Sequence, residues 1–192
     1  MIFQEDIYME KIIAKGGYPL APLPVALVSC GTVEKPLVLT ISWTGLVCST
    51  PLKVFISVQP VRNSYPAIKE SGEFVINLAD ESMLKAADYC GTNSGRDVDK
   101  FKECGITAEK CEHISAPMIA ECPISVECKV CERLSLGSHD MFVADVLAVH
   151  VDPKLMTEGK YDFSKLPLLA YANSRYYKLG DYLGNYGVSK TL

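Results

Sequence analysis

Six short runs rich in Val, Ile and Phe constrain the fold of this 192-residue chain more than any other feature. β-Branched and aromatic residues favour strands, and each run is bounded by Gly, Pro, Asn or charged residues that favour turns. A doubly wound parallel sheet needs strands and helices in strict alternation, and that order is absent. The pattern predicts a mainly β protein, a closed or partly open antiparallel barrel. Its strands are expected at residues 24–30, 37–43, 53–59, 73–78, 123–130 and 141–151.

Short helices are predicted between these strands. Residues 64–72 begin with Ser, carry Pro in the first turn and end at Gly, which are helix start and stop signals. Residues 80–91 begin with Asp-Glu and also end at Gly. Residues 97–105 are the candidate for a short third helix. We expect these few helices at the periphery of the barrel.

The chain is 48% hydrophobic and has no internal repeat or linker, so residues 1–192 are expected to form one domain. The strand expected at 53–59 is apolar on both faces, because it contains Val54, Phe55, Ile56 and Val58. The outer face of a monomeric barrel should be more polar. The excess favours a symmetric homodimer; the alternative is that the helices and the C-terminal segment cover that face.

The charge and the N-terminal sequence restrict the partners and the location. A net charge of −4 gives no electrostatic reason to expect a nucleic-acid partner. Residues 1–17 are charged throughout and lack the apolar region of a signal peptide. No apolar run approaches the roughly 20 residues needed to span a bilayer. We therefore expect a soluble, cytoplasmic protein that does not bind membranes.

The eight cysteines are expected to be reduced. A chain of this length and apolar content does not need a disulfide framework. Its one CxxC, Cys128 to Cys131, lies in β-branched, alternating sequence, where positions i and i+3 of a strand point to opposite faces. The two thiols would diverge, which favours a packing role over a zinc or iron–sulfur site. His113 and His150 are isolated, and no metal site is expected.

The segment around the only Trp is the first candidate for ligand binding. If residues 37–44 continue as one strand, Thr40, Ser42 and Thr44 share one face, and Trp43 lies on the other. The hydroxyl row offers donors and acceptors to a ligand with alternating polar edges. The alternative is a solvated strand face with a core Trp, since Thr is a good strand former.

A second candidate lies where the strand at 53–59 gives way to the helix at 64–72. Arg62 and Ser64 stand beside the expected helix N-terminus, and together they could hold a phosphate. An ordinary capped helix with an exposed Arg is the alternative. An aromatic segment followed about twenty residues later by a phosphate cradle fits flavin mononucleotide (FMN). No GxGxxG or GxxxxGK[ST] motif supports a dinucleotide or P-loop site.

These motifs, taken together, resemble the flavin reductase-like family of FMN-binding split barrels, and most closely the flavoredoxins. The resemblance runs from about residue 18 to the C-terminus. It implies a six-stranded antiparallel Greek-key split barrel that forms a homodimer, with FMN near the subunit interface. Its carriers are "YPLAPLPVALVSCG", "LTISWTGLVCSTPLKVFISVQPVRNSY", "EFVINL", "SGRDVDKF", "LGSHDMFVADV" and "YYKLGDYLGNYG".

The resemblance also implies the residues that contact FMN. The phosphate-binding Arg-x-Ser/Thr pattern falls on residues 62–64, and the Gly-x-His pattern on residues 137–139. The implied positions are Thr40, Ser42, Trp43 and Thr44, Cys48, Ser49 and Thr50 in the following loop, Arg62, Asn63 and Ser64, the basic residue Lys100, His139, and either Tyr171 or Tyr176.

Ferric reductases that resemble this chain place a Cys and a His near the nicotinamide, which makes Cys48 and His139 the candidate catalytic residues. Packing for the Cys and a structural role for the His are the alternatives. Hydride transfer is chemistry of the cofactors, so the protein is expected to supply stacking geometry and electrostatic tuning.

Three functions remain open. FMN could accept hydride from NAD(P)H and pass electrons to a second acceptor, which makes the protein an oxidoreductase. FMN could instead stay bound and exchange electrons with a redox carrier protein, as flavoredoxins are thought to do. The third function is a reduced-flavin partner for a monooxygenase.

Overall fold

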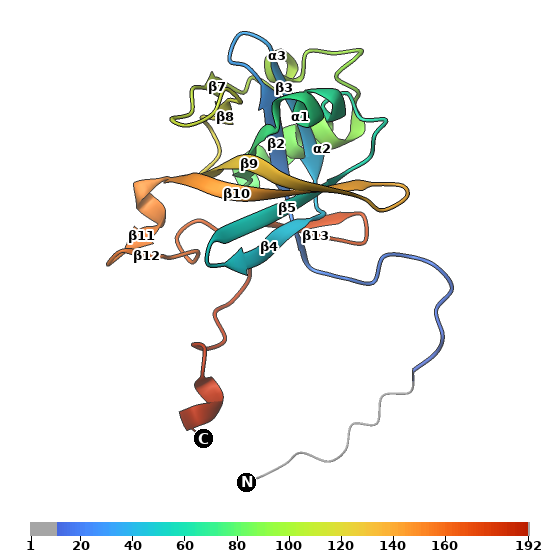
Figure 1. The fold of residues 1–192 in the computed structure, drawn as a ribbon. Coiled ribbons are helices and arrows are strands. Elements are labelled where there is room, and N and C mark those ends of the chain that lie inside the picture. The colour runs from blue at the N-terminus through green and yellow to red at the C-terminus, as the bar shows by residue number, and fades with distance from the viewer. Residues whose placement is uncertain (1–10, 192) are drawn as a thin grey trace.

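The computed structural model describes residues 11–191; residues 1–10 and 192 of the predicted single domain lie outside the described residues. Seven strands form one antiparallel sheet in the order β3-β2-β6-β9-β10-β5-β4. The sheet curves around a core, with β3 and β4 at its two edges, so the barrel is split rather than closed (Figure 1). The strands are β2 Ala26–Gly31, β3 Pro36–Ile41, β4 Thr44–Ser49, β5 Leu52–Val58, β6 Glu73–Leu78, β9 Ile124–Ser135 and β10 Asp140–Val151.

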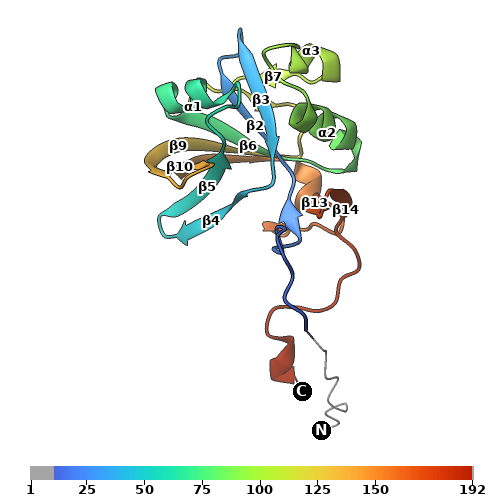
Figure 2. The same ribbon diagram turned by 90° about the vertical axis from the view of Figure 1, so that its right-hand side faces the viewer.

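Two hydrophobic cores lie on the two sides of β2 and β3. One is the barrel interior, where Phe74 and Phe142 pack against α1 (Tyr65–Ser71). The other lies under α2 (Leu84–Thr92) and α3 (Lys100–Cys104). Figure 2 shows α1 on one side of β3 and the other two helices on the opposite side.

Smaller elements surround the main sheet. A three-stranded sheet has the order β1-β13-β14, and its β13–β14 hairpin lies beside α2. These and the other short elements are β1 Leu23–Pro24, β7 Ala108–Glu109, β8 Met118–Ile119, β11 Met156–Thr157, β12 Lys160–Tyr161, β13 Leu169–Ala172, β14 Arg175–Lys178, and the 3-10 helices η1 Glu81–Met83, η2 Pro153–Leu155 and η3 Val188–Thr191.

All six predicted strands are present, and the prediction of a mainly β split barrel is confirmed. β4 is a seventh strand, and the resemblance implied a loop for its last two residues, Cys48 and Ser49. It pairs with β5 at the edge of the sheet, and its Gly45 lets the Phe55 ring pack close, because a Cβ there would lie 3.2 Å from the Phe55 ring. The loop prediction for Cys48 and Ser49 is therefore wrong.

The expectation of one continuous strand through residues 37–44 is also wrong. β3 ends at Ile41, the chain bends at Ser42, and β4 begins at Thr44. The Trp43 carbonyl accepts a hydrogen bond from the Ser57 amide at 2.9 Å, which holds the bend against β5. Because the chain changes direction here, a face shared by alternating residues does not extend past β3.

The three predicted helices are present, with bounds that differ by a few residues, and Gly72 ends α1 as predicted. Ser64 precedes α1, but its side chain makes no capping hydrogen bond. Asp80 caps η1, which leads into α2, by accepting a hydrogen bond from the Ser82 amide. Asp99 caps α3, and Gly105 ends that helix at φ 62°, a conformation that glycine adopts without strain.

The eight cysteines are free thiols. Cys128 is buried and Cys131 is exposed on β9, which confirms that the CxxC pair points to opposite faces. Within residues 11–191, no group of three or more His, Cys, Asp or Glu side chains is arranged to hold a metal ion. None of the helices in that range is long and apolar enough to cross a membrane.

Candidate functional site

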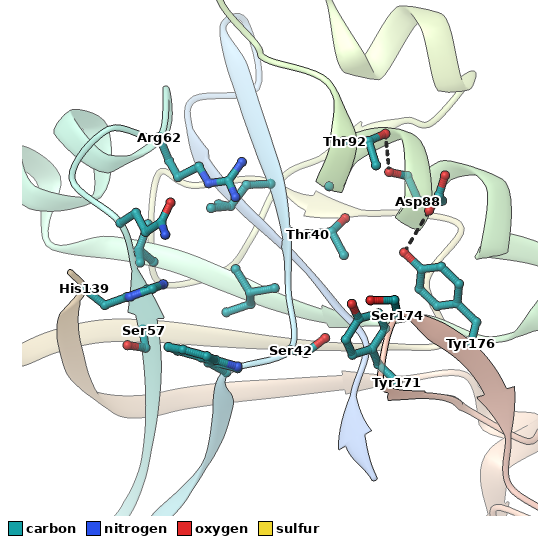
Figure 3. A pocket seen from close by; sticks show the side chains of 16 residues that line it. Thr40, Ser42, Ser57, Arg62, Asp88, Thr92, His139, Tyr171, Ser174 and Tyr176 are labelled. Carbon is teal, nitrogen blue, oxygen red and sulfur yellow. Dashed lines mark hydrogen bonds between the residues drawn. The ribbon is translucent and has the colours of Figure 1, made fainter. Parts of the chain in front are cut away.

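A cavity of about 420 Å³ lies between the end of the main sheet, α2 and the β13–β14 hairpin. Figure 3 shows Arg62 and His139 on one side of it, with Asp88 and Tyr176 on the other. Thr40 and Ser42 lie between the two sides, where β3 ends. The volume falls within the range of small-molecule sites, roughly 300–1,000 Å³. This cavity is the candidate ligand site.

Trp43 and His139 form an aromatic pair at one side of the cavity. Their ring centroids are 4.5 Å apart, with the planes inclined by 35°. The indole is 36% exposed, so it is not the core residue of the alternative prediction. His139 lies in the β9–β10 turn, where Gly137 has a φ of 101° that favours glycine. A flat ligand could pack against this pair.

Partial burial lowers the pKa of His139 below its ordinary value, and the positive charge of Arg62 lowers it further. The imidazole is therefore neutral at pH 7, with one ring nitrogen available to accept a hydrogen bond. Its Nδ1 lies 2.9 Å from the Ser138 hydroxyl. His139 thus offers the cavity a polar edge without adding a charge.

The hydroxyl side chains of Thr40, Ser42 and Thr44 do not line up on one strand face. Thr40 donates a hydrogen bond of 2.6 Å to the Ala87 carbonyl, which ties β3 to α2. Thr44 donates one of 2.6 Å to the Phe55 carbonyl, inside the β4–β5 hairpin. Thr40 and Ser42 line the cavity, and Thr44 is not among its lining residues. The bend at Ser42 separates Thr44 from the two residues that line the cavity.

A smaller cavity of about 210 Å³ adjoins the first. The two cavities share Arg62 and Thr40, so the Arg62 side chain lies where they meet. Asn63 and Ser64 line the smaller one, together with the loop after α2. Arg62 takes part in none of the ion pairs within residues 11–191, which leaves its charge available to an anion.

The segment 91–96 is a part of this site that sequence reasoning missed. Its residues line the smaller cavity together with Arg62, and they comprise the last two residues of α2 and the loop that follows. The sequence "GTNSGR" carries a signal, because Gly, Asn and Ser in succession are typical of a loop that offers polar groups. Ser57, Asp88 and Ser174 line the larger cavity and were likewise not predicted.

Lys100, the basic residue that the resemblance implies near the flavin, makes its hydrogen bonds to the protein backbone. Its side chain is buried, and its ammonium donates hydrogen bonds to the carbonyls of Val38 at 3.1 Å and Cys90 at 2.7 Å. Burial lowers its pKa. Lys100 lines the smaller cavity but not the larger one. Its charge is thus used to satisfy a carbonyl near the C-terminus of α2 and to join that helix to β3.

Cys48, Ser49 and Thr50 lie near the tip of the β4–β5 hairpin. The Cys48 thiol lies 3.5 Å from the Thr50 carbonyl, and none of the three residues lines either cavity. The structure thus separates Cys48 from His139, the other candidate catalytic residue, which does line the larger cavity.

The two C-terminal tyrosines between which the sequence left a choice both line the larger cavity. Tyr171 and Tyr176 face each other across the β13–β14 hairpin, with ring centroids 5.6 Å apart. The Tyr176 hydroxyl donates to Asp88 at 3.1 Å, so this hairpin is tied to α2 (Figure 3). Burial and Asp88 raise the pKa of Tyr176 to about 12, so its hydroxyl stays protonated.

Comparison with known proteins agrees with this architecture. Flavoredoxin of Desulfovibrio vulgaris (Miyazaki F) is 29% identical with a TM-score of 0.85, covering 95% of this chain and 100% of that one. Flavoredoxin from Methanosarcina acetivorans is 30% identical with a TM-score of 0.86, covering 92% and 95%. The reductase component of a 4-nitrophenol 4-monooxygenase/4-nitrocatechol 2-monooxygenase from Rhodococcus opacus is 28% identical over 123 residues, 64% of this chain and 63% of that protein. The profile of the flavin reductase like domain matches residues 19–180, and the chain belongs to that family.

Proposed function

We propose that this chain binds FMN and works as a redox protein. The observation that carries the proposal is the position of Arg62, which forms no ion pair with the described residues 11–191 and lies where an aromatic-walled cavity meets a smaller polar one. FMN has a flat ring system at one end and a phosphate at the other, and the two cavities offer these ends different surroundings. The similarity to two flavoredoxins supports the same cofactor.

Residues of this chain would hold the two ends of FMN by different interactions. Trp43 and His139 would pack against the ring, and the neutral imidazole would add a hydrogen-bonding edge. Arg62 would pair with the phosphate, with Asn63, Ser64 and the segment 91–96 around it. When bound, FMN supplies the chemistry of accepting and passing on electrons. The protein's part is to bind and orient it.

We further propose that the donor is NADPH or NADH, which makes the protein an oxidoreductase. The similarity to a monooxygenase reductase component favours this reaction. The similarity to flavoredoxins favours the second candidate, a protein that exchanges electrons with a redox carrier protein. The two candidates share the cofactor and differ in the electron donor.

Anaerobic addition of NADPH and then NADH to the FMN-loaded protein separates these candidates. We expect one of them to bleach the flavin absorption band faster than it bleaches free FMN at the same concentration, because the protein orients the ring for hydride transfer. If only dithionite or a reduced carrier protein bleaches the band, the reductase proposal is wrong and the carrier function takes its place.

We also propose that the protein is a homodimer. The β4–β5 hairpin exposes the apolar side chains of Leu46 at 77%, Val47 at 52% and Leu52 at 40%. A cluster of this kind on an edge strand favours association with another surface. Light scattering coupled to size-exclusion chromatography should give twice the 21.1 kDa mass of the chain. The mass of a single chain at micromolar concentration would contradict the proposal.

A further inference from the structure

A hydrogen-bonded cluster of Tyr65, Asp140 and Arg133 lies next in sequence to two residues of the candidate site. The Tyr65 hydroxyl donates to the Asp140 carboxylate at 2.5 Å, and Arg133 donates to both, at 3.1 and 3.3 Å. Tyr65 and Asp140 are 8% and 5% exposed. Hydrogen bonds to a buried carboxylate are stronger than those between neutral groups, so this cluster is a firm connection.

The cluster connects two segments that are far apart in the chain. Tyr65 is the first residue of α1 and Asp140 the first residue of β10, while Arg133 comes from β9. The Tyr65 ring also packs edge-on against Phe142, with centroids 5.6 Å apart. The start of α1 is thereby fixed to the β9–β10 hairpin from the interior side of the barrel.

The backbone of Arg62 is hydrogen-bonded to Tyr65, a member of the cluster. The Tyr65 amide donates to the Arg62 carbonyl at 3.1 Å, and the Arg62 amide donates to the Gln59 carbonyl at 3.0 Å. The chain therefore leaves β5 in two consecutive turns that end at Tyr65. At the other side of the connection, His139 precedes Asp140 directly. Two hydrogen bonds and one peptide bond thus link Arg62 through Tyr65 and Asp140 to His139.

The protonation states keep this path intact at neutral pH. The hydrogen bond from Tyr65 holds the pKa of Asp140 below its ordinary value, and Arg133 acts in the same direction. The bond to Asp140 raises the pKa of Tyr65 above its ordinary value. The carboxylate stays charged and the phenol stays protonated, so donor and acceptor remain matched.

We propose that Tyr65 is a positioning residue for phosphate recognition. Its hydroxyl, held by Asp140 and Arg133, fixes the turn that carries Arg62, and thereby places the guanidinium where the two cavities meet. This inference rests on the proposed binding of FMN. Tyr65 does not line either cavity, so it acts through Arg62 rather than on the ligand.

The Tyr65→Phe variant tests the inference, with FMN and riboflavin as the two probes. Riboflavin has the same ring system but no phosphate, so it does not use Arg62. We expect the Kd for FMN to rise about tenfold and the Kd for riboflavin to stay within about twofold. In an Arg62→Ala background, Tyr65→Phe should add no further loss for FMN, because the two residues act as one unit.

Tyr161→Phe is the matched control, since Tyr161 is 50% exposed and stacks on Phe163 away from the cluster. Asp140→Asn is a second variant that weakens the same hydrogen bond and should give the same selective loss. The inference would be overturned if the variants bound FMN and riboflavin with equally weakened affinity, or if both variants kept the wild-type Kd for FMN. Either result would leave the proposal that the wild-type chain binds FMN standing. Failure of the wild-type chain to bind FMN would overturn the proposed function and this inference together.

Discussion

Replacing Arg62 by alanine is expected to weaken FMN binding by about 1.5–3 kcal/mol, or roughly 10- to 150-fold in Kd. The side chain lies where the two cavities meet and has no ion-pair partner within residues 11–191. A phosphate at this position would gain a charged, two-point hydrogen-bonding partner in Arg62. Titration of FMN, followed by quenching of its fluorescence, measures the change.

Two controls make the Arg62→Ala result specific. The affinity for riboflavin should be nearly unchanged, because the loss concerns the phosphate alone. Arg62→Lys should recover part of the affinity, since it keeps the charge and loses the planar fork. An Arg62→Ala protein that binds FMN as tightly as the wild type would place the phosphate elsewhere on the chain.

The Asn77→Leu variant is expected to lower the free energy of unfolding by about 3 kcal/mol. Asn77 is fully buried on β6, and its amide donates to the Leu27 carbonyl and the Ser29 hydroxyl, both at 2.9 Å. Its carbonyl oxygen accepts from the Ile119 amide at 3.0 Å and the Ser125 hydroxyl at 2.7 Å. Leucine has the same branched arrangement of four side-chain heavy atoms but leaves these buried groups without their partner.

Urea denaturation of the wild type and the variant checks this value. Asn185→Leu, in the exposed C-terminal segment, is the matched control and should change the free energy of unfolding by less than about 0.5 kcal/mol. If Asn77→Leu changes stability no more than the control does, the network around Asn77 does not hold β2, β8 and β9 to β6 as described.

The sequence predicted the strands well because their apolar runs are local signals. The β6 prediction matches the structure at both ends, since Gly72 precedes the run at φ 65° and Leu78 closes it. β4 was missed because Thr, Gly and Ser in that segment favour a loop, and its strand conformation depends on pairing with β5. Local propensity contains no information about that partner.

The candidate site was only partly predictable for the same reason. Arg62 and His139 line the larger cavity, whereas Lys100 lines only the smaller one and donates hydrogen bonds to two backbone carbonyls. The bond between Tyr65 and Asp140 joins residues 75 positions apart, and nothing in either local sequence indicates it. A single sequence identifies candidate residues, and long-range packing decides which of them reach the ligand.

The visible absorption spectrum of the protein, recorded after incubation with FMN and removal of unbound flavin, tests the central claim most directly. We predict a flavin band that co-elutes with the protein in an amount equimolar to the chain, and its loss in the Arg62→Ala variant after the same removal step. A wild-type protein that elutes with no flavin band would contradict the assignment of these two cavities to FMN.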